Sequence, residues 1–398
     1  MNTVSKTLQR LSESATLAMS RRSRELAEQG IDVISLSLGE PDFNTPDFIK
    51  EAAKKAIDDN FTKYPPVNGY LSLRQAISQK FLRDNNLNYT PNQIVVSTGA
   101  KQSIANAVLS ILNEGDECLL PSPYWVSYEE IVKITGATPV RIGTEIDSDF
   151  KVTPAQLEAS ITEKTRMIIY SSPCNPTGSV YSQSELEALA AVLLKYPNIL
   201  VISDEIYELI NFEGTNFSLA AIEGMYDRTI TINGVSKGFA MTGWRIGYMG
   251  APEWIAKACS KMQGQITSAP SGISQKAAEA AVLSNPLEMS YMKDAFKIRR
   301  DMVVSHLKKI PGLVVNIPKG AFYVFPDVSA LFGKSYGKFV INNADDLCEY
   351  LLMDAHVALV TGAAFGADNY IRISYAASTE VLKDALQRIE TAIKKLNE

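Results

Sequence analysis

The segment Asn233-Gly234-Val235-Ser236-Lys237-Gly238-Phe239, with Met241-Thr242-Gly243-Trp244-Arg245 shortly after it, is the part of this chain that identifies its fold. It follows an apolar run at 229–232 and places a serine, a lysine and an arginine on one loop of small residues. The lysine amine can condense with an aldehyde as a Schiff base, and the hydroxyl and guanidinium groups can bind a phosphate. The segment therefore predicts a site for a ligand that carries both groups. Because lysines near small residues are usually surface lysines, this prediction depends on what the rest of the chain supplies.

Short apolar runs alternate with helix-like segments on both sides of this motif. Helices are expected at 102–112, 184–196 and 254–263. Strands separated by helices indicate an α/β layer with a mostly parallel sheet, in which ligands bind at the carboxyl ends of the strands. The predicted strands are 94–97, 118–120, 139–142, 167–170, 200–203, 229–232 and 246–250.

The pattern changes near residue 290, where a long charged helix is predicted at 291–309. After it, the sequence predicts strands at 314–317, 322–325, 358–360 and 371–374, and helices at 345–355 and 380–396. We therefore expect three parts: an N-terminal arm and helix (1–45) that packs on the small domain, a large domain (46–290) and a small α+β domain (291–398).

The composition excludes several classes of protein. With 398 residues, 46% hydrophobic and 21% charged, the chain is typical of a soluble globular protein, and its net charge of -5 argues against nucleic-acid binding. No apolar stretch approaches the roughly 18 residues of a membrane span, and no signal-peptide core is present, so a cytoplasmic location is expected. Only two histidines are present, which argues against a histidine-based metal site and a Ser-His-Asp triad. The four cysteines form no C-x-x-C pair and are expected to be free thiols in a reducing compartment.

Asp204 ends the very apolar strand at 199–203. A carboxylate there is costly to bury unless a cation or hydrogen-bond donors face it. A protonated pyridine nitrogen would serve, and Tyr207 could donate a hydrogen bond to a phenolic oxygen of the same ring. The alternative is an Asp that caps a helix N-terminus.

Three further polar segments follow predicted strands. Thr98-Gly99-Ala100-Lys101 opens a helix whose N-terminus favours an anion, and Asn175 is held between prolines in a rigid loop. Trp125 could stack on a planar ligand. The corresponding structural alternatives are an ordinary strand–helix turn, a tight turn and a core tryptophan.

Arg372 lies inside the apolar strand at 371–374. A guanidinium in such a place binds a carboxylate through two parallel hydrogen bonds. No acidic residue neighbours it in sequence, so a substrate carboxylate would fit, and a salt bridge to a distant Asp or Glu is the alternative.

Together these motifs resemble the class I aminotransferases, which are pyridoxal-phosphate enzymes. Ser236-Lys237 with Met241-Thr242-Gly243-Trp244-Arg245-Ile246-Gly247-Tyr248, and Asn175-Pro176-Thr177-Gly178, carry the resemblance, which covers nearly the whole chain. It is similar above all to the bacterial aspartate aminotransferases of thermophile type, a branch that is also associated with prephenate as a substrate. The resemblance implies fold type I of the pyridoxal-phosphate-dependent transferases: a large domain with a mixed, mostly parallel seven-stranded sheet between helices, and a smaller α+β domain.

The resemblance also implies a role for each motif residue. Lys237 would be the Schiff-base lysine and proton carrier, Asp204 the partner of the pyridine nitrogen, and Tyr207 a ligand of the phenolic oxygen. The other cofactor ligands would be Gly99, Ala100, Lys101, Trp125, Asn175, Ser236, Arg245 and, from a neighbouring subunit, Tyr64. This last assignment implies a homodimer with shared active sites. The substrate would contact Gly39, Trp125, Asn175, Arg372, Lys101, Thr16 and Ser14.

The expected reaction is pyridoxal-phosphate-dependent transamination of an L-amino acid to a 2-oxo acid by a ping-pong mechanism. Lys101, helped by Thr16 and Ser14, is the candidate for the distal carboxylate, which points to aspartate and 2-oxoglutarate, giving oxaloacetate and glutamate, with conversion of prephenate to arogenate as a second activity. If Lys101 is only a solvated lysine, a broad-specificity, aromatic or alanine aminotransferase becomes the alternative. A pyridoxal-phosphate-dependent β-lyase and an aminotransferase-like ligand sensor are further alternatives.

Overall fold

A seven-stranded sheet forms the centre of the larger part of the molecule, with strand order β2-β8-β7-β6-β5-β3-β4. The computed structural model describes residues 4–396, so the ends of the predicted N-terminal and C-terminal parts, 1–3 and 397–398, lie outside it. Only β8 runs against its neighbours, so the predicted mostly parallel sheet is confirmed. The strands are β2 (Ile94–Ser97), β3 (Glu117–Ser122), β4 (Thr138–Gly143), β5 (Thr165–Ser171), β6 (Leu200–Asp204), β7 (Thr229–Gly234) and β8 (Gly247–Gly250).

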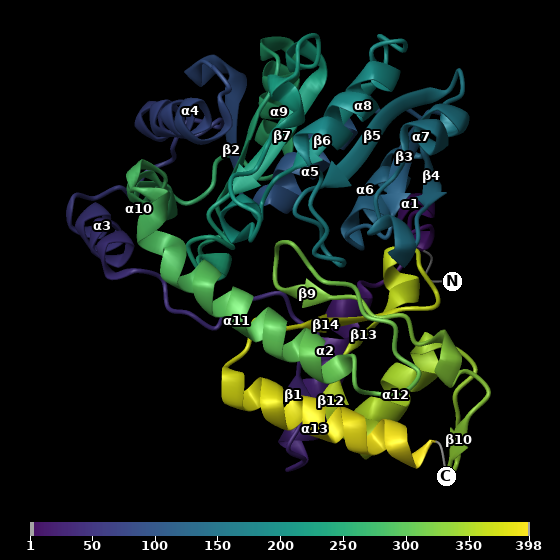
Figure 1. Ribbon diagram of the computed structural model, residues 1–398. Coiled ribbons are helices and arrows are strands. Elements are labelled where there is room, and N and C mark those ends of the chain that lie inside the picture. The colour runs from purple at the N-terminus through teal and green to yellow at the C-terminus, as the bar shows by residue number, and fades with distance from the viewer. Residues whose placement is uncertain (1–3, 397–398) are drawn as a thin grey trace.

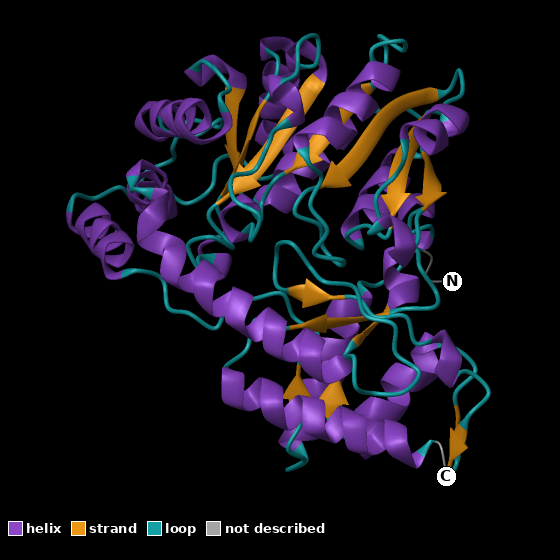
Figure 2. Ribbon diagram, in the orientation of Figure 1, coloured by secondary structure: helices purple, strands orange, loops and turns teal. Residues whose placement is uncertain are grey.

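Helices cover both faces of this sheet (Figures 1 and 2). Successive residues of a strand point to opposite faces, so Met167 and Ile169 of β5 pack in one core, and Ile168 and Tyr170 pack in another. The first core is shared with α5 (Ala100–Ile111), α6 (Ser127–Thr135) and α9 (Glu253–Ile266), and the second with α7 (Pro154–Ser160) and α8 (Gln183–Leu193). Burial on both faces explains why the inner strands β5 and β6 are apolar runs.

Three more helices lie beside the β2 end of the sheet (Figure 1): α3 (Asp47–Asp58), α4 (Leu71–Asn85) and α10 (Gly272–Leu283). The long helix α11 (Ser290–Leu307) then leads from α10 to the smaller part of the molecule.

The smaller part combines short strands with helices on one side (Figure 2). Its three-stranded antiparallel sheet consists of β13 (Val360–Thr361), β14 (Ile371–Ser374) and β9 (Tyr323–Val324). β1 (Ile34–Ser35) pairs in parallel with β12 (Val357–Ala358). The remaining elements are α12 (Ala344–Asp354), α13 (Thr379–Lys395) and the β10 (Ser335–Tyr336)–β11 (Phe339–Val340) pair.

The N-terminal segment contacts both parts. α1 (Lys6–Gln9) lies next to α6, where the Ser12 amide donates to Glu130 at 2.7 Å. α2 (Ala15–Glu28) lies against β12 and β13, and Arg22 pairs with Glu349 of α12. The start of α2 therefore lies at the junction of the two parts.

Two strand predictions for the smaller part are wrong in detail. The segment 314–317 forms only an isolated bridge at Val314, because the Asn316 side chain takes up the local hydrogen bonds, donating to the Thr177 carbonyl and accepting from the Phe325 amide. The segment 358–360 is divided between two sheets, since Ala358 pairs with β1 and Val360 pairs with β14.

Candidate active site

A cavity of about 230 Å³ lies where the carboxyl ends of β5, β6 and β7 meet the smaller part of the molecule. Most of the residues predicted from the sequence line it: Ser14, Thr16, Gly39, Ala100, Lys101, Trp125, Asn175, Asp204, Tyr207, Ser236, Lys237, Arg245 and Arg372. Gly99 is directly behind this lining, next to Arg245. Tyr64 does not line it, and its side chain is 99% exposed on the surface of the chain.

Lys237 lies on the loop that follows β7, and its Nζ donates to the Gly39 carbonyl at 2.6 Å. Burial lowers the pKa of this amine to about 8, with Arg245 and Arg372 acting in the same direction and Glu40 and Asp204 opposing it. Near neutral pH, Lys237 is therefore deprotonated more easily than a surface lysine, as a nucleophilic amine requires.

Asp204 is the last residue of β6, and its carboxylate faces the cavity. Its Oδ2 accepts from the Tyr128 hydroxyl at 2.6 Å, and its Oδ1 accepts from the Ile206 amide at 3.3 Å. Burial raises the pKa of Asp204 to about 6, and these two hydrogen bonds and the nearby Lys237 oppose the rise. The helix-cap alternative is wrong, because the next helical turn, η3 (Glu208–Ile210), begins only after Tyr207.

The Tyr207 hydroxyl shares a 2.9 Å hydrogen bond with the Tyr323 hydroxyl from β9. The Lys237 Nζ lies 6.0 Å from the centre of the Tyr207 ring. Tyr207 of the larger part and Tyr323 of the smaller part are thus hydrogen-bonded to each other in the lining of the cavity.

Two glycines bring the start of α5 close to the loop of Arg245. A Cβ on Gly99 would lie 2.5 Å from the Arg245 Nη2, and a Cβ on Gly247 would lie 2.1 Å from the Ala100 amide nitrogen. Side chains at these positions would therefore separate the helix N-terminus from the guanidinium. Free amides at a helix N-terminus, a guanidinium and the Ser236 hydroxyl together form a lining suited to an anion.

Arg372 is buried and is held by neutral groups. It donates through Nη1 to Asn175 Oδ1 at 3.0 Å and through Nη2 to the Ser37 carbonyl, and its guanidinium lies 4.6 Å from the centre of the Tyr323 ring. Within residues 4–396, no Asp or Glu forms an ion pair with Arg372, and its Nε has no hydrogen-bond partner. The salt-bridge alternative is therefore not observed, and the buried guanidinium can bind an anionic ligand.

Lys101 lies on the first turn of α5 and lines the cavity. Its ammonium is 4.9 Å from the centre of the Trp125 ring. Ser14 and Thr16, at the start of α2, line the same cavity, together with Leu17.

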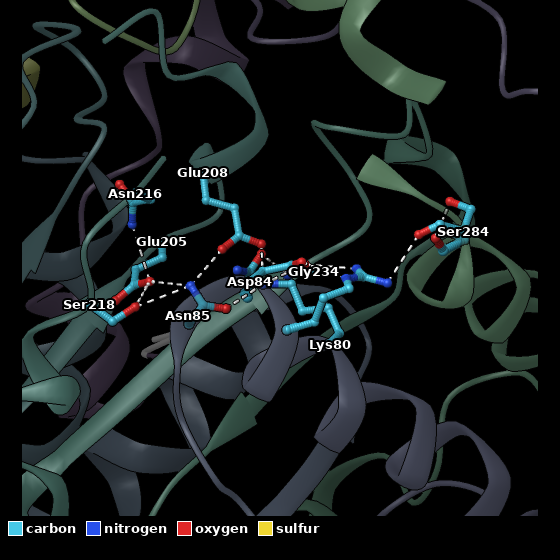
Figure 3. Close-up of polar contacts among 12 residues, drawn as sticks. Lys80, Asp84, Asn85, Glu205, Glu208, Asn216, Ser218, Gly234 and Ser284 are labelled. Carbon is cyan, nitrogen blue, oxygen red and sulfur yellow. Dashed lines mark hydrogen bonds and ion pairs between the residues drawn. The ribbon is translucent and has the colours of Figure 1, made fainter. Parts of the chain in front are cut away.

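Glu205, the residue after Asp204, does not line the cavity but belongs to a buried polar cluster behind it (Figure 3). Glu205 accepts from Ser203 at 2.9 Å, from Ser218 at 2.6 Å, from Asn216 at 3.2 Å and from Asn85 at 3.3 Å. Burial raises the pKa of Glu205 to about 7. Nearby, Glu208 pairs with Lys80 of α4, and the Lys80 Nζ also donates to Asn85 at 2.7 Å.

Comparison with known proteins identifies the family. Residues 31–389 match the model of the aminotransferases of class I and II. The chain belongs to this family. The aspartate/prephenate aminotransferase of Cereibacter sphaeroides is 48% identical over 391 residues, which are 97% of this chain and 98% of that protein.

Solved structures agree with this assignment. The aspartate aminotransferase of Rhizobium meliloti superposes with a TM-score of 0.95 at 42% identity, covering 99% of this chain and 100% of that one. The aspartate aminotransferase of Thermus thermophilus, solved with maleate, gives a TM-score of 0.92 at 38% identity, covering 98% and 100%. The resemblance predicted from the sequence, including the thermophile-type branch, is confirmed.

This aminotransferase depends on pyridoxal 5′-phosphate, as its class does. The cavity fits that group on three grounds. It holds a buried amine of lowered pKa at Lys237, a buried carboxylate at Asp204 that no cation pairs with among the described residues, and an anion lining where Gly99 and Gly247 admit Arg245 and Ala100. None of the helices within residues 4–396 has the length and apolar character needed to cross a bilayer.

The sequence did not assign roles to several residues that line or support this site. Tyr128 and Tyr323 hold hydroxyl groups against Asp204 and Tyr207, and the Thr242 hydroxyl donates to Glu40 over the Lys237 loop. Tyr128 follows Trp125 by three residues, on the first turn of α6, so a search near Trp125 for a donor to Asp204 could have found it. Tyr323 comes from a strand of the other part of the chain, and nothing local in the sequence links it to Tyr207.

Proposed function

We propose that this aminotransferase moves the amino group of aspartate to 2-oxoglutarate, and that prephenate is a second amino acceptor. The observation that carries the proposal is that one cavity has two cationic side chains, Arg372 and Lys101, in addition to Lys237 and Arg245. Two carboxylates on one substrate need two such cations. The relatives named aspartate/prephenate aminotransferase, and the Thermus enzyme solved with the dicarboxylate maleate, support this choice.

When bound, pyridoxal phosphate supplies an aldehyde for the amino group and a protonated ring that withdraws electrons from the substrate Cα. Lys237 would take the proton from the substrate Cα and deliver it to the carbon that carries the aldehyde in the free cofactor, and a pKa of about 8 suits this task near neutral pH. Asp204 would keep the ring nitrogen protonated, Tyr207 and Asn175 would hydrogen-bond the phenolic oxygen, and Trp125 would pack against the ring.

The phosphate is assigned to the Gly99, Ala100 and Lys101 amides together with Ser236 and Arg245. Arg372 and the Gly39 backbone bind the α-carboxylate of the substrate, with Asn175 and Trp125 beside it. The distal carboxylate is assigned to the Lys101 ammonium with Thr16 and Ser14.

A homodimer follows from the same assignments. Tyr64 is 99% exposed and lies outside the cavity of its own chain, so we assign it to the phosphate of a neighbouring subunit. The division into an N-terminal arm, a large domain (46–290) and a small domain (291–398), and a cytoplasmic location, belong to the same proposal.

Half-reactions with single amino acids test the substrate assignment. Lys101→Ala is expected to lower kcat/KM for aspartate about tenfold and to leave that for phenylalanine within about twofold, because only aspartate carries a distal carboxylate. Lys261→Ala, an exposed lysine on α9, is the matched control. Equal effects of Lys101→Ala on both substrates would contradict the aspartate assignment and favour a broad or aromatic specificity.

A further inference from the structure

Tyr128 is a wholly buried tyrosine on the first turn of α6, and its hydroxyl lies 2.6 Å from Asp204 Oδ2. Its ring packs edge-on against Trp125, with the ring centres 5.5 Å apart. The side chain is thus fixed on both sides, with its one polar atom directed at the carboxylate.

This hydroxyl is the only side-chain donor to Asp204 in the part of the chain that the structure describes. An ionised carboxylate only accepts hydrogen bonds, so the phenol must act as the donor. A donor to the charged form of a carboxylate stabilises that form. The other titratable groups around the pair are Lys237 and Tyr207 near Asp204, and Cys174 near both residues. None of the three hydrogen-bonds to the carboxylate within the described residues.

The Asp204 carboxylate would be strongly disfavoured in its ionised form without such a donor, because burial opposes the charge and the Ile206 amide lies at a longer distance, 3.3 Å. A neutral Asp204 could not keep a ring nitrogen protonated. We propose that Tyr128 is a positioning residue that holds Asp204 ionised and fixes one of its oxygens, so that the carboxylate is ready for the ring nitrogen of the cofactor. This inference rests on the role proposed above for Asp204.

Cofactor binding to the full-length chain, freed of its cofactor, tests the proposal with two ligands. One is pyridoxal 5′-phosphate, and the other is its analogue with a carbon in place of the ring nitrogen. Tyr128→Phe removes only the hydroxyl and is expected to weaken binding of pyridoxal phosphate about tenfold and to leave binding of the analogue unchanged. The kcat for aspartate should fall with little change in KM.

Tyr124→Phe is the matched control, because Tyr124 is also buried and also donates its hydroxyl to a carboxylate, that of Glu129, outside the cavity. It should leave the preference between the two ligands unchanged. Thermal unfolding of both variants measures any general loss of packing.

Asp204→Asn separates this proposal from the one on which it rests. If Asp204→Asn loses the preference for pyridoxal phosphate and Tyr128→Phe keeps it, the role of Tyr128 is overturned while that of Asp204 stands. An equal loss of both ligands with Tyr128→Phe would show a structural role only and would also overturn the proposal. If Asp204→Asn itself keeps the preference, both assignments fail.

Discussion

Asp204 and Glu205 are neighbours in sequence and both are buried, yet they have opposite surroundings. Asp204 is 4% exposed, faces the cavity, and receives one hydroxyl and one amide. Glu205 is 1% exposed and receives four donors from the chain itself. Burial is the main cause of the raised pKa of both, about 6 for Asp204 and about 7 for Glu205.

The difference shows that burial and a shifted pKa do not by themselves mark a catalytic carboxylate. Consecutive residues at the end of a strand point to opposite sides. The turn at the end of β6 therefore has a front, where Asp204 faces the cofactor cavity, and a back, where Glu205 contacts Asn85 of α4. On the back, protein groups satisfy the carboxylate. On the front, the Asp204 carboxylate can still accept a hydrogen bond from a ligand.

The largest expected effect is on activity, and it should separate the two carboxylates. Asp204→Asn is expected to lower kcat about a hundredfold to a thousandfold, since an amide cannot hold a ring nitrogen protonated. Glu205→Gln, the same chemical change one residue later, should lower kcat less than about threefold, because its carbonyl still accepts from Ser218. Steady-state kinetics with aspartate measures both. A loss with Glu205→Gln as large as that with Asp204→Asn would mean that the back of the turn takes part in the chemistry.

The next effect is on stability, and it concerns the back of the turn. Lys80→Met leaves Glu208 buried without its cation and should cost about 3 kcal/mol of the free energy of unfolding. Replacing both partners, Lys80→Met with Glu208→Leu, should recover much of that loss, because no uncompensated charge remains. Urea unfolding measures these values.

Lys257→Met serves as the control, because Lys257 forms an exposed ion pair with Glu253 on α9. Such surface pairs contribute at most about 1 kcal/mol. If Lys80→Met were no more destabilising than this control, the cluster behind β6 would not be the rigid support that its burial indicates.

The front of the turn was largely predictable from the sequence, and the back was not. Lys237, Asp204 and Arg372 stand out because a charged residue at the end of or inside an apolar strand needs a partner, and that signal is local. Glu205 has the same local signal. What distinguishes it are Asn85, Asn216 and Ser218, whose approach depends on how α4 and a distant loop pack.

The same limit applies to the fold. Six strands of the large sheet are buried along almost their whole length, and most of them are short apolar runs that the sequence makes visible. The edge strand β4 is more exposed but still carries Val140 and Ile142. In the smaller part, Leu359 lies where one apolar run is shared between two sheets, and Asn316 replaces strand pairing with side-chain bonds. Both outcomes depend on partners far away in the sequence.

The smallest expected effect is on the pH dependence of the free energy of unfolding, because the two carboxylates titrate in different pH ranges. The pKa of Glu205 in the folded chain, about 7, lies above the ordinary 4.5, so its protonated form favours folding. That contribution is fully present below about pH 4.5 and is lost as the pH rises through about 7. Asp204, with a pKa of about 6 in the folded chain, acts with the same sign but completes its change at lower pH.

Urea unfolding of the cofactor-free chain between pH 6 and pH 8 should therefore show a loss of about 1–2 kcal/mol that Glu205→Gln largely removes. Asp204→Asn should remove a smaller part of the loss in this interval, because Asp204 has titrated mostly below it. An unchanged pH slope in Glu205→Gln would mean that the four donors and Lys80 keep Glu205 ionised throughout. Glu205 would then not lose its proton at a higher pH than Asp204, and the predicted order of the two titrations would be wrong.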